Sequence, residues 1–195
     1  SGSGTGKGFV GIGASIGVQD IDANTTAKIE NASIGGTSET TYGNLEVTAQ
    51  EESDITSIVG TASGGLANMS AAFSVSANDV DTVTKAYIDS DENIKAAAIN
   101  VAAKNLANST IGVGSFAVGK NSVGIATAIA LFDNAVTAYL KGDDASDGKD
   151  NTVNGSSINV EAENVYNGAA NYDDANNTTA KTVAIGGGIG TGAVA

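Results

Sequence analysis

The residues of this chain that could do chemistry are carboxylates, hydroxyls and a few tyrosines. Among 195 residues there is no His and no Cys, which excludes the usual catalytic triads, thiol chemistry and most zinc sites. Four aspartates gather at Asp143, Asp144, Asp147 and Asp150. Carboxylate oxygens suit calcium, so this segment is a candidate calcium loop. The third and twelfth ligand positions of an EF-hand loop hold Ala145 and Asn154, however, which favours a solvated acidic loop.

The glycine-rich segments do not form a nucleotide-binding motif. SGSGTGKG, at residues 1–8, lacks the first Gly and the final Ser or Thr of a phosphate-binding loop. The glycines at 11–13, 112–114 and 186–190 lack the third glycine of a dinucleotide fingerprint, and no βαβ pattern surrounds them. They favour close stacking of chain segments instead. We therefore predict no cofactor, no metal site beyond the candidate loop, and no enzymatic activity.

Three aspartates recur in similar segments: IDANTTAKI (21–29), VDTVTKAYI (80–88) and FDNAVTAYL (132–140). Asp22, Asp81 and Asp133 follow one another at intervals of about 52 to 59 residues, which is a period typical of repeat proteins. A second pattern, apolar–polar–Val–x–Ala, recurs within 44–49, 99–103 and 157–162. Such a period indicates repeated units that bury their apolar faces against their neighbours. We predict that Asp22, Asp81 and Asp133 each start a turn by bonding local backbone amides.

Two tyrosines occupy equivalent positions in these segments. Tyr87 and Tyr139 stand where the first segment has Lys28. If Ala86 and Ile88 point inward from a strand, Tyr87 points outward. Exposed aromatic rings can stack on sugars or anchor a protein partner, so Tyr87 and Tyr139 are possible surface contacts. The alternative is a ladder of rings packed along the surface of the array.

The elements that position these residues are predicted to be β-strands. Apolar residues alternate with their neighbours at a period of two over 12–18, 71–77 and 123–131. The alanines of 94–106 also suit a helix, but the match of this stretch to 45–49 and 158–162 favours a strand. With 41% apolar residues but only nine aromatics, we expect a thin core of small and β-branched side chains.

Many short strands in units of about 52 to 59 residues predict an all-β, parallel β-solenoid. If one coil takes roughly 18 to 24 residues, each unit holds two or three coils. We expect one continuous domain over 1–195, with repeats at roughly 1–59, 60–111 and 112–182 and a fourth beginning at 183–195. Neither end has the polar cap of a solenoid, which favours an excerpt of a longer protein or copies that stack end to end.

The net charge of the chain limits the kinds of partner that it can bind. Nine lysines against 22 acidic residues give a net charge of −13, which predicts no nucleic-acid partner. No stretch approaches the roughly 18 apolar residues that cross a bilayer, so we expect no membrane insertion by this segment. No signal peptide is visible at the start of the sequence. If the protein is secreted, its targeting segment lies outside these residues.

The alternation of Gly-rich apolar runs with D-x-x-x-T-x-A-Y-I-like segments and S-x-N-V-x-A-like strands resembles a known class of repeats. These are the repeats of large type V-secreted bacterial adhesins and leukotoxin-like exoproteins, and the resemblance covers nearly all of the chain. It implies a right-handed β-helix that is exported and displayed on the bacterial surface or secreted. Residues 120–130 and 181–195 are also similar to the heads of trimeric autotransporter adhesins, whose shorter repeat is not sustained here.

Together these features predict a structural or adhesive rod segment of an extracellular bacterial protein. Its partners would be a host-surface protein or glycan, or copies of itself. One alternative is a self-assembling fibre whose subunits stack end to end. A less favoured alternative is a β-helix glycan hydrolase or lyase, for which two carboxylates would have to face each other across a sugar.

Overall fold

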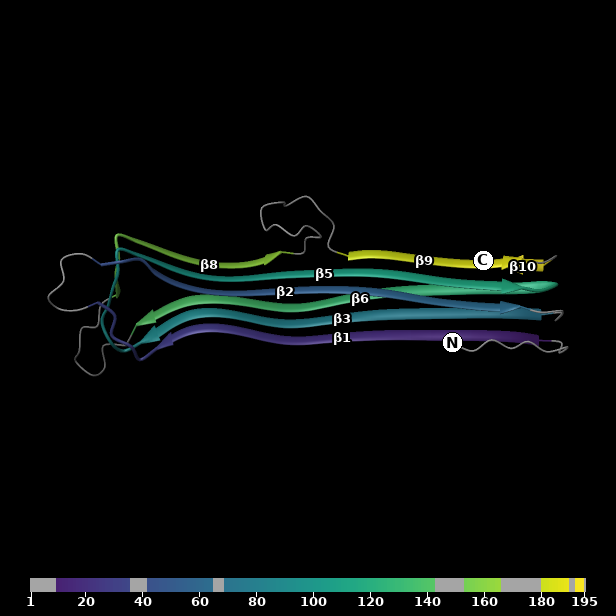
Figure 1. The fold of residues 1–195 in the computed structure, drawn as a ribbon, viewed down its shortest axis with the longest axis horizontal. Coiled ribbons are helices and arrows are strands. Elements are labelled where there is room, and N and C mark those ends of the chain that lie inside the picture. The colour runs from purple at the N-terminus through teal and green to yellow at the C-terminus, as the bar shows by residue number, and fades with distance from the viewer. Residues whose placement is uncertain are drawn as a thin grey trace.

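The computed structural model describes residues 10–35, 42–64, 69–142, 153–165, 180–189 and 192–194 (Figure 1). These residues form ten β-strands and no helix. The strands are β1 (Val10–Glu30), β2 (Leu45–Gly64), β3 (Met69–Ser90), β4 (Ile94–Lys95), β5 (Ala98–Val118), β6 (Asn121–Gly142), β7 (Val153–Asn154), β8 (Ser157–Val165), β9 (Ala180–Ile189) and β10 (Gly192–Val194). No helix within these ranges could cross a membrane. The prediction of strands rather than a helix over 94–106 is confirmed.

The strands pair in parallel and form two large sheets. The first sheet has the order β1-β3-β6-β10; the second has the order β2-β5-β8, with β9 pairing the later part of β5. The chain therefore passes back and forth between the sheets as it advances (Figure 1). A small third sheet, β4-β7, lies beside a bridge between Ile34 and Ile94. The predicted all-β class with parallel pairing is confirmed.

The five longest strands change the expected dimensions. They are β1, β2, β3, β5 and β6, and each has 20 to 22 residues. At about 3.3 Å per residue, one such strand is roughly 70 Å long, which gives the molecule its elongated shape (Figure 1). The expectation of two or three coils per unit is wrong, because one pass over both sheets already uses a whole repeat unit.

Strand pairing brings similar residues side by side. Asp22 pairs with Asp81 and Asp81 with Asp133, while Ile99 pairs with both Leu45 and Ile158. The sequence separation between register partners differs between the sheets. It is two residues shorter for β3 and β6 than for β2 and β5. The connection from β2 to β3 is longer than that from β5 to β6 by the same two positions. A difference of two keeps every side chain on its own face of the sheet.

The prediction that three aspartates start turns is wrong. Asp22, Asp81 and Asp133 lie deep inside β1, β3 and β6, with their side chains exposed on the outer face of the first sheet. Aspartate is common in turns, but an outward position on a strand keeps its carboxylate in water equally well. The chain turns after β1 instead, at Asn31 (φ 48°) and Gly35 (φ 84°). A Cβ on Gly35 would lie only 2.7 Å from the carbonyl oxygen of Lys95.

The core between the two sheets changes along the strands. Next to the turn after β1, apolar side chains such as Ile88, Ile94 and Ile99 form the largest buried cluster. Midway along the strands, Ile55, Val80 and Ala107 pack with the half-buried Ile21 and Phe132. Towards the start of β1, the buried side chains are mostly hydroxyls, namely Ser57, Thr61, Ser63, Ser70, Ser74, Ser76, Ser115 and Ser122.

Candidate functional site

The apolar side chains of β1 change faces along the strand. At its start, Ile12, Ile16 and Val18 point outward, and Ile16 is 77% exposed. Further along, Ile21 and Ile29 pack against the core clusters. Neighbouring positions on a strand face opposite sides, and Val18 and Ile21 are separated by an odd number of steps. The alternation therefore switches phase at this point without any break in the strand.

The same change occurs in β3 and β6. Phe73 and Val75 point outward, whereas Val80 and Ile88 are fully buried. In β6 the phase switches between adjacent residues, since Leu131 is exposed and Phe132 packs on the core. We call the resulting surface the first-sheet apolar face: Val10, Ile12, Ile16, Val18, Met69, Phe73, Val75, Ile125, Ile129 and Leu131.

Behind this face, the interior is narrow and lined with hydroxyls. The Oγ atoms of Ser57 and Ser76 are 2.7 Å apart, as are those of Ser63 and Ser70. A Cβ on Gly17 would lie 2.5 Å from Cγ2 of Val59, so larger side chains cannot enter here without a shift. Most of this space is filled by serines and glycines, together with the buried Ile111 and Val113 of β5, and most of the large apolar residues of this stretch lie on the outside.

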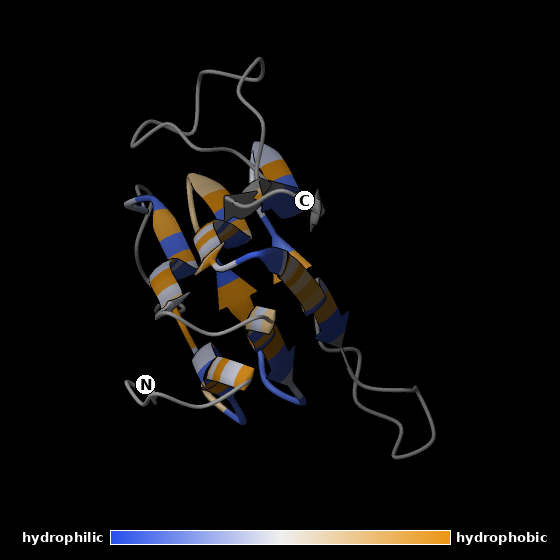
Figure 2. Cartoon of the chain, turned by 90° about the vertical axis from the view of Figure 1, so that its right-hand side faces the viewer, coloured by the Kyte–Doolittle hydropathy of each residue, from blue (hydrophilic) through white to orange (hydrophobic). Residues whose placement is uncertain are grey.

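The second sheet has an apolar surface over the same stretch. Ile58 and Ile185 are strongly exposed, and Phe116 and Val118 are partly exposed. Gly60, Thr61, Ala62, Gly114, Ser115, Phe116 and Ile185 line an open, shallow groove of about 550 Å³, which we call the glycine groove. Figure 2 views the molecule from the end where these stretches lie and shows hydrophobic segments on both sheets.

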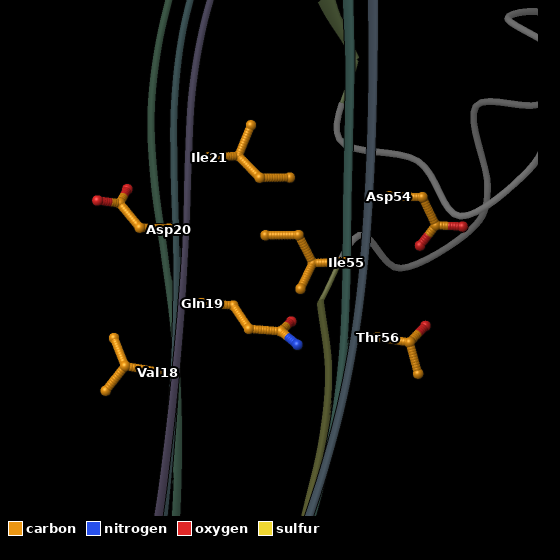
Figure 3. Close-up of a pocket in the computed structure, with 7 residues that line it drawn as sticks. All are labelled: Val18, Gln19, Asp20, Ile21, Asp54, Ile55 and Thr56. Atoms are coloured by element: carbon orange, nitrogen blue, oxygen red, sulfur yellow. The ribbon is translucent and has the colours of Figure 1, made fainter.

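The two apolar surfaces end at the same level along the strands. Figure 3 shows this level, where Ile21 and Ile55 point towards each other between the sheets. Asp20 and Asp54 point away from each other, each on the outside of its own sheet. Both residues line an open hollow of about 550 Å³ at this level. On one side of this level, residues 10–19, 55–64, 69–78, 109–132, 180–189 and 192–194 contain no acidic residue and two lysines, Lys120 and Lys181. We call this part the apolar half and the other described residues the acidic half.

The acidic half begins with a row of carboxylates on the first sheet. Asp22, Asp81 and Asp133 are register neighbours, and Asp20 and Asp79 pair two residues earlier on the same face. Loss of solvent around Asp81, followed by the negative charges of Asp133, Asp22, Asp79 and Asp20, raises the pKa of the Asp81 carboxyl. No group of three or more acidic residues in the described ranges is arranged to hold a metal ion. The effect of these neighbouring charges on the pKa of Asp81 indicates repulsion within the row.

The predicted tyrosine pair forms a stack further along the same face. The rings of Tyr87 and Tyr139 lie 4.7 Å apart and are nearly parallel, with an interplanar angle of 7°. Tyr87 Oη donates a hydrogen bond to Glu30 Oε1 (2.6 Å), and Lys28 Nζ bonds Glu30 Oε2 (2.7 Å). These hydrogen bonds raise the pKa of Tyr87 and of Lys28 and lower that of Glu30. Both tyrosines are half-buried, and their stacking matches the ladder of rings given above as the alternative.

Some predicted features fall outside the described residues, and one observed feature was not predicted. The candidate calcium loop with Asp143, Asp144, Asp147 and Asp150 lies outside the described ranges, as does the glycine-rich segment 1–8. The sequence interpretation missed the two outward apolar surfaces. Their signal was present in the odd spacing between Val18 and Ile21 and in the adjacent pair Leu131 and Phe132.

Comparisons of this chain with protein-family models, with curated proteins and with solved structures find no match. The geometry described above is therefore the basis for any functional conclusion.

Proposed function

We propose that the chain is a stretch of right-handed parallel β-solenoid that serves as a structural and adhesive segment of a bacterial surface-displayed or secreted protein. One turn of the solenoid would take about 52 to 59 residues, the spacing at which successive passes pair. The observation that carries this proposal is the in-register pairing of these passes over strands of 20 to 22 residues, as between β1 and β3 or β2 and β5. Pairing of this kind places chemically similar residues in rows across the outer faces.

The proportions favour a segment that presents a broad lateral surface. Each added turn would lengthen the array by only about 4.8 Å, but it would add a strand roughly 70 Å long to each face. To project a distant binding region, the array would therefore need many residues for each ångström of length. The geometry favours the display of a wide, repetitive face instead.

A non-enzymatic role is supported by the placement of the carboxylates. Glycoside hydrolysis needs two carboxyl groups on either side of one sugar. Asp20 and Asp54 point in opposite directions from the two sheets (Figure 3). The row of Asp22, Asp81 and Asp133 lies along one outer face. Neither arrangement encloses a sugar, so a hydrolase or lyase remains the less favoured alternative.

The tyrosine stack is the proposed contact for a host-surface glycan or protein. Tyr87 and Tyr139 offer aromatic surface on a rigid strand scaffold, beside the charged Lys28 and Glu30. Aromatic surface of this type packs against the apolar faces of sugars, and adjacent charged groups bond their hydroxyls. No cofactor is part of this proposal.

Binding assays with matched variants test this function. The purified chain should bind host cells or a subset of arrayed glycans, and the double variant Tyr87→Ala/Tyr139→Ala should lose most of that binding. Thr137→Ala, an outward change on the same strand as Tyr139, is the control and should bind as the parent does. The glycans should keep their length during incubation. Retained binding by the double variant removes the tyrosine contact, and glycan shortening overturns the non-enzymatic role.

A fibre whose subunits stack end to end is the second candidate. In that case the outer strands of the sheets, such as β1, would pair with another copy. Electron microscopy distinguishes this candidate from the first, because edge pairing would yield filaments with a strand repeat of about 4.8 Å running along the filament axis.

A further inference from the structure

The glycine groove contains outward-facing glycines that the fold itself does not need. A Cβ on Gly114 would have no atom within 4 Å, and one on Gly60 would meet a single carbonyl oxygen at 3.9 Å. Inward glycines differ, since a Cβ on Gly17 or Gly186 would come within 2.5 Å of a neighbour. Glycine weakens a strand interior and often marks a place where another chain approaches closely. The outward glycines therefore point to a partner that lies outside this chain.

The chain itself provides a surface that is complementary to the groove. The first-sheet apolar face carries large side chains, among them Met69, Phe73 and Ile125, over the same length of strand. The groove has a floor of glycine and alanine between the walls Phe116 and Ile185. Protruding apolar side chains on one face match a glycine-floored depression on the other. Sheets pack face to face about 10 Å apart when such surfaces meet.

Charge determines how two copies can overlap. Outside the apolar half, the first sheet presents Asp22, Asp81 and Asp133, and the second presents Glu46 and Glu52. Each copy also carries a net charge of −13. Full side-by-side alignment would place these carboxylates against one another. An antiparallel overlap restricted to the apolar halves keeps the acidic halves apart.

We propose that the first-sheet apolar face of one copy of this chain docks into the glycine groove of a second copy, with the two strand directions antiparallel and only the apolar halves overlapping. The proposal goes beyond the adhesive role and does not depend on it. The contact joins two different surfaces, so a docked pair keeps one free groove, on the first copy, and one free apolar face, on the second. Such a heterologous contact extends into open assemblies rather than closing as a dimer.

The strength of the contact follows from its size. Nine residues of strand cover about 30 Å, and three neighbouring strands cover about 14 Å, so the overlap is roughly 400 Å² on each copy. This is below the roughly 800 Å² per partner of a standard stable interface. Assembly should therefore be weak and concentration-dependent. It should also strengthen with added salt, because salt screens the repulsion between two copies that each carry a net charge of −13.

The experiment is sedimentation velocity of the whole chain across a range of protein and salt concentrations, with two blocking variants. Gly114→Lys places a charge in the groove without straining the fold, and Ile16→Lys places one on the apolar face. Each variant alone should associate at least about tenfold more weakly than the parent, because an unpaired ammonium would be buried. Mixed together, they should form a 1:1 dimer that does not extend, since each retains one intact surface.

Controls and the remaining outcomes complete the test. Thr48→Lys and Ala135→Lys are outward changes in the acidic half and should associate at least as well as the parent. Circular dichroism should show the same strand content for all variants. The proposal is overturned if the parent stays monomeric at every concentration and salt level, or if Gly114→Lys associates normally while Ile16→Lys does not. It is equally overturned if a monomeric parent floats with phosphatidylcholine vesicles, because lipid would then be the occupant.

Discussion

At the residue scale, parallel pairing of repeated segments places aspartates side by side, and their like charges repel one another. Asp22, Asp81 and Asp133 lie in separate repeats of the sequence, yet pairing makes them neighbours about 4.8 Å apart. The central carboxylate, Asp81, loses solvent and has acidic neighbours on both sides, and these effects raise its pKa. Removal of the Asp81 charge should reduce the electrostatic repulsion within the row.

We predict that Asp81→Asn raises the free energy of unfolding at pH 7. Because the pKa of Asp81 is higher in the folded state, its carboxylate destabilises the fold above that pKa. The penalty fades as the pH falls through the folded pKa and is absent below the ordinary value of 3.8. The advantage of the variant should therefore shrink as the pH falls towards 3.8. Urea unfolding at several pH values measures this.

The control for this prediction is Glu46→Gln, which changes the net charge equally but lies on the second sheet. Asp81→Asn should stabilise more than Glu46→Gln at pH 7 and low salt, and the difference should decrease at high salt. Equal stabilisation by both variants would mean that total charge, rather than the row, sets the cost.

At the element scale, one strand contains two different environments. β1 and β3 start with large apolar residues outside and glycines or serines inside, and they end with charged residues outside and isoleucines such as Ile29 and Ile88 inside. A periodicity of two identifies both stretches as strand but does not state which face is buried. The effect of replacing an isoleucine should therefore depend on its half of the strand.

We predict that Ile88→Ala lowers the free energy of unfolding by about 2–5 kcal/mol, since Ile88 is fully buried in the apolar cluster and its truncation leaves a cavity. Ile16→Ala, measured at low protein concentration, should change it by less than about 0.5 kcal/mol, because the Ile16 side chain is largely exposed. Chemical unfolding monitored by circular dichroism tests both variants. Comparable losses would contradict the outward placement of Ile16.

At the scale of the whole molecule, strand length dictates an elongated particle. Two stacked sheets with strands of 20 to 22 residues form a long, thin body (Figure 1). Most of its exposed large apolar residues lie at one end of the strands and its acidic residues at the other, so the surface of the molecule is amphipathic along its long axis. Both proposals use this shape: the adhesive face lies in the acidic half and the self-docking surfaces lie in the apolar half.

Small-angle X-ray scattering at low concentration tests this shape. We predict a maximum dimension of at least about 70 Å, from the length of one strand. The radius of gyration should exceed the roughly 16 Å of a compact domain of this length. A maximum dimension of only about 45 Å, the length of a stack of some nine short coils, would contradict the long continuous strands and restore the short-coil arrangement.

The sequence alone determined the class of structure and the equivalence of the repeated segments. Alternation over 12–18, 71–77 and 123–131 predicted strands, and recurrence of the Asp-led segments identified equivalent residues, which the structure pairs directly although the expected short coils would have kept them apart. The outward position of Tyr87 also followed from its neighbours Ala86 and Ile88, which are buried. These features depend on local periodicity and on similarity between segments, and both are encoded in the order of residues.

Only the tertiary structure decided strand length, the site of the turns and the identity of the buried face. Strand β1 can continue past Asp22 because the Asp22 side chain points outward and stays in water. The width of the space between the sheets is set by close approaches such as that of Gly17 to Val59, where a side chain on residue 17 would clash. That width is a property of two sheets packed together, and no segment of the sequence specifies it alone.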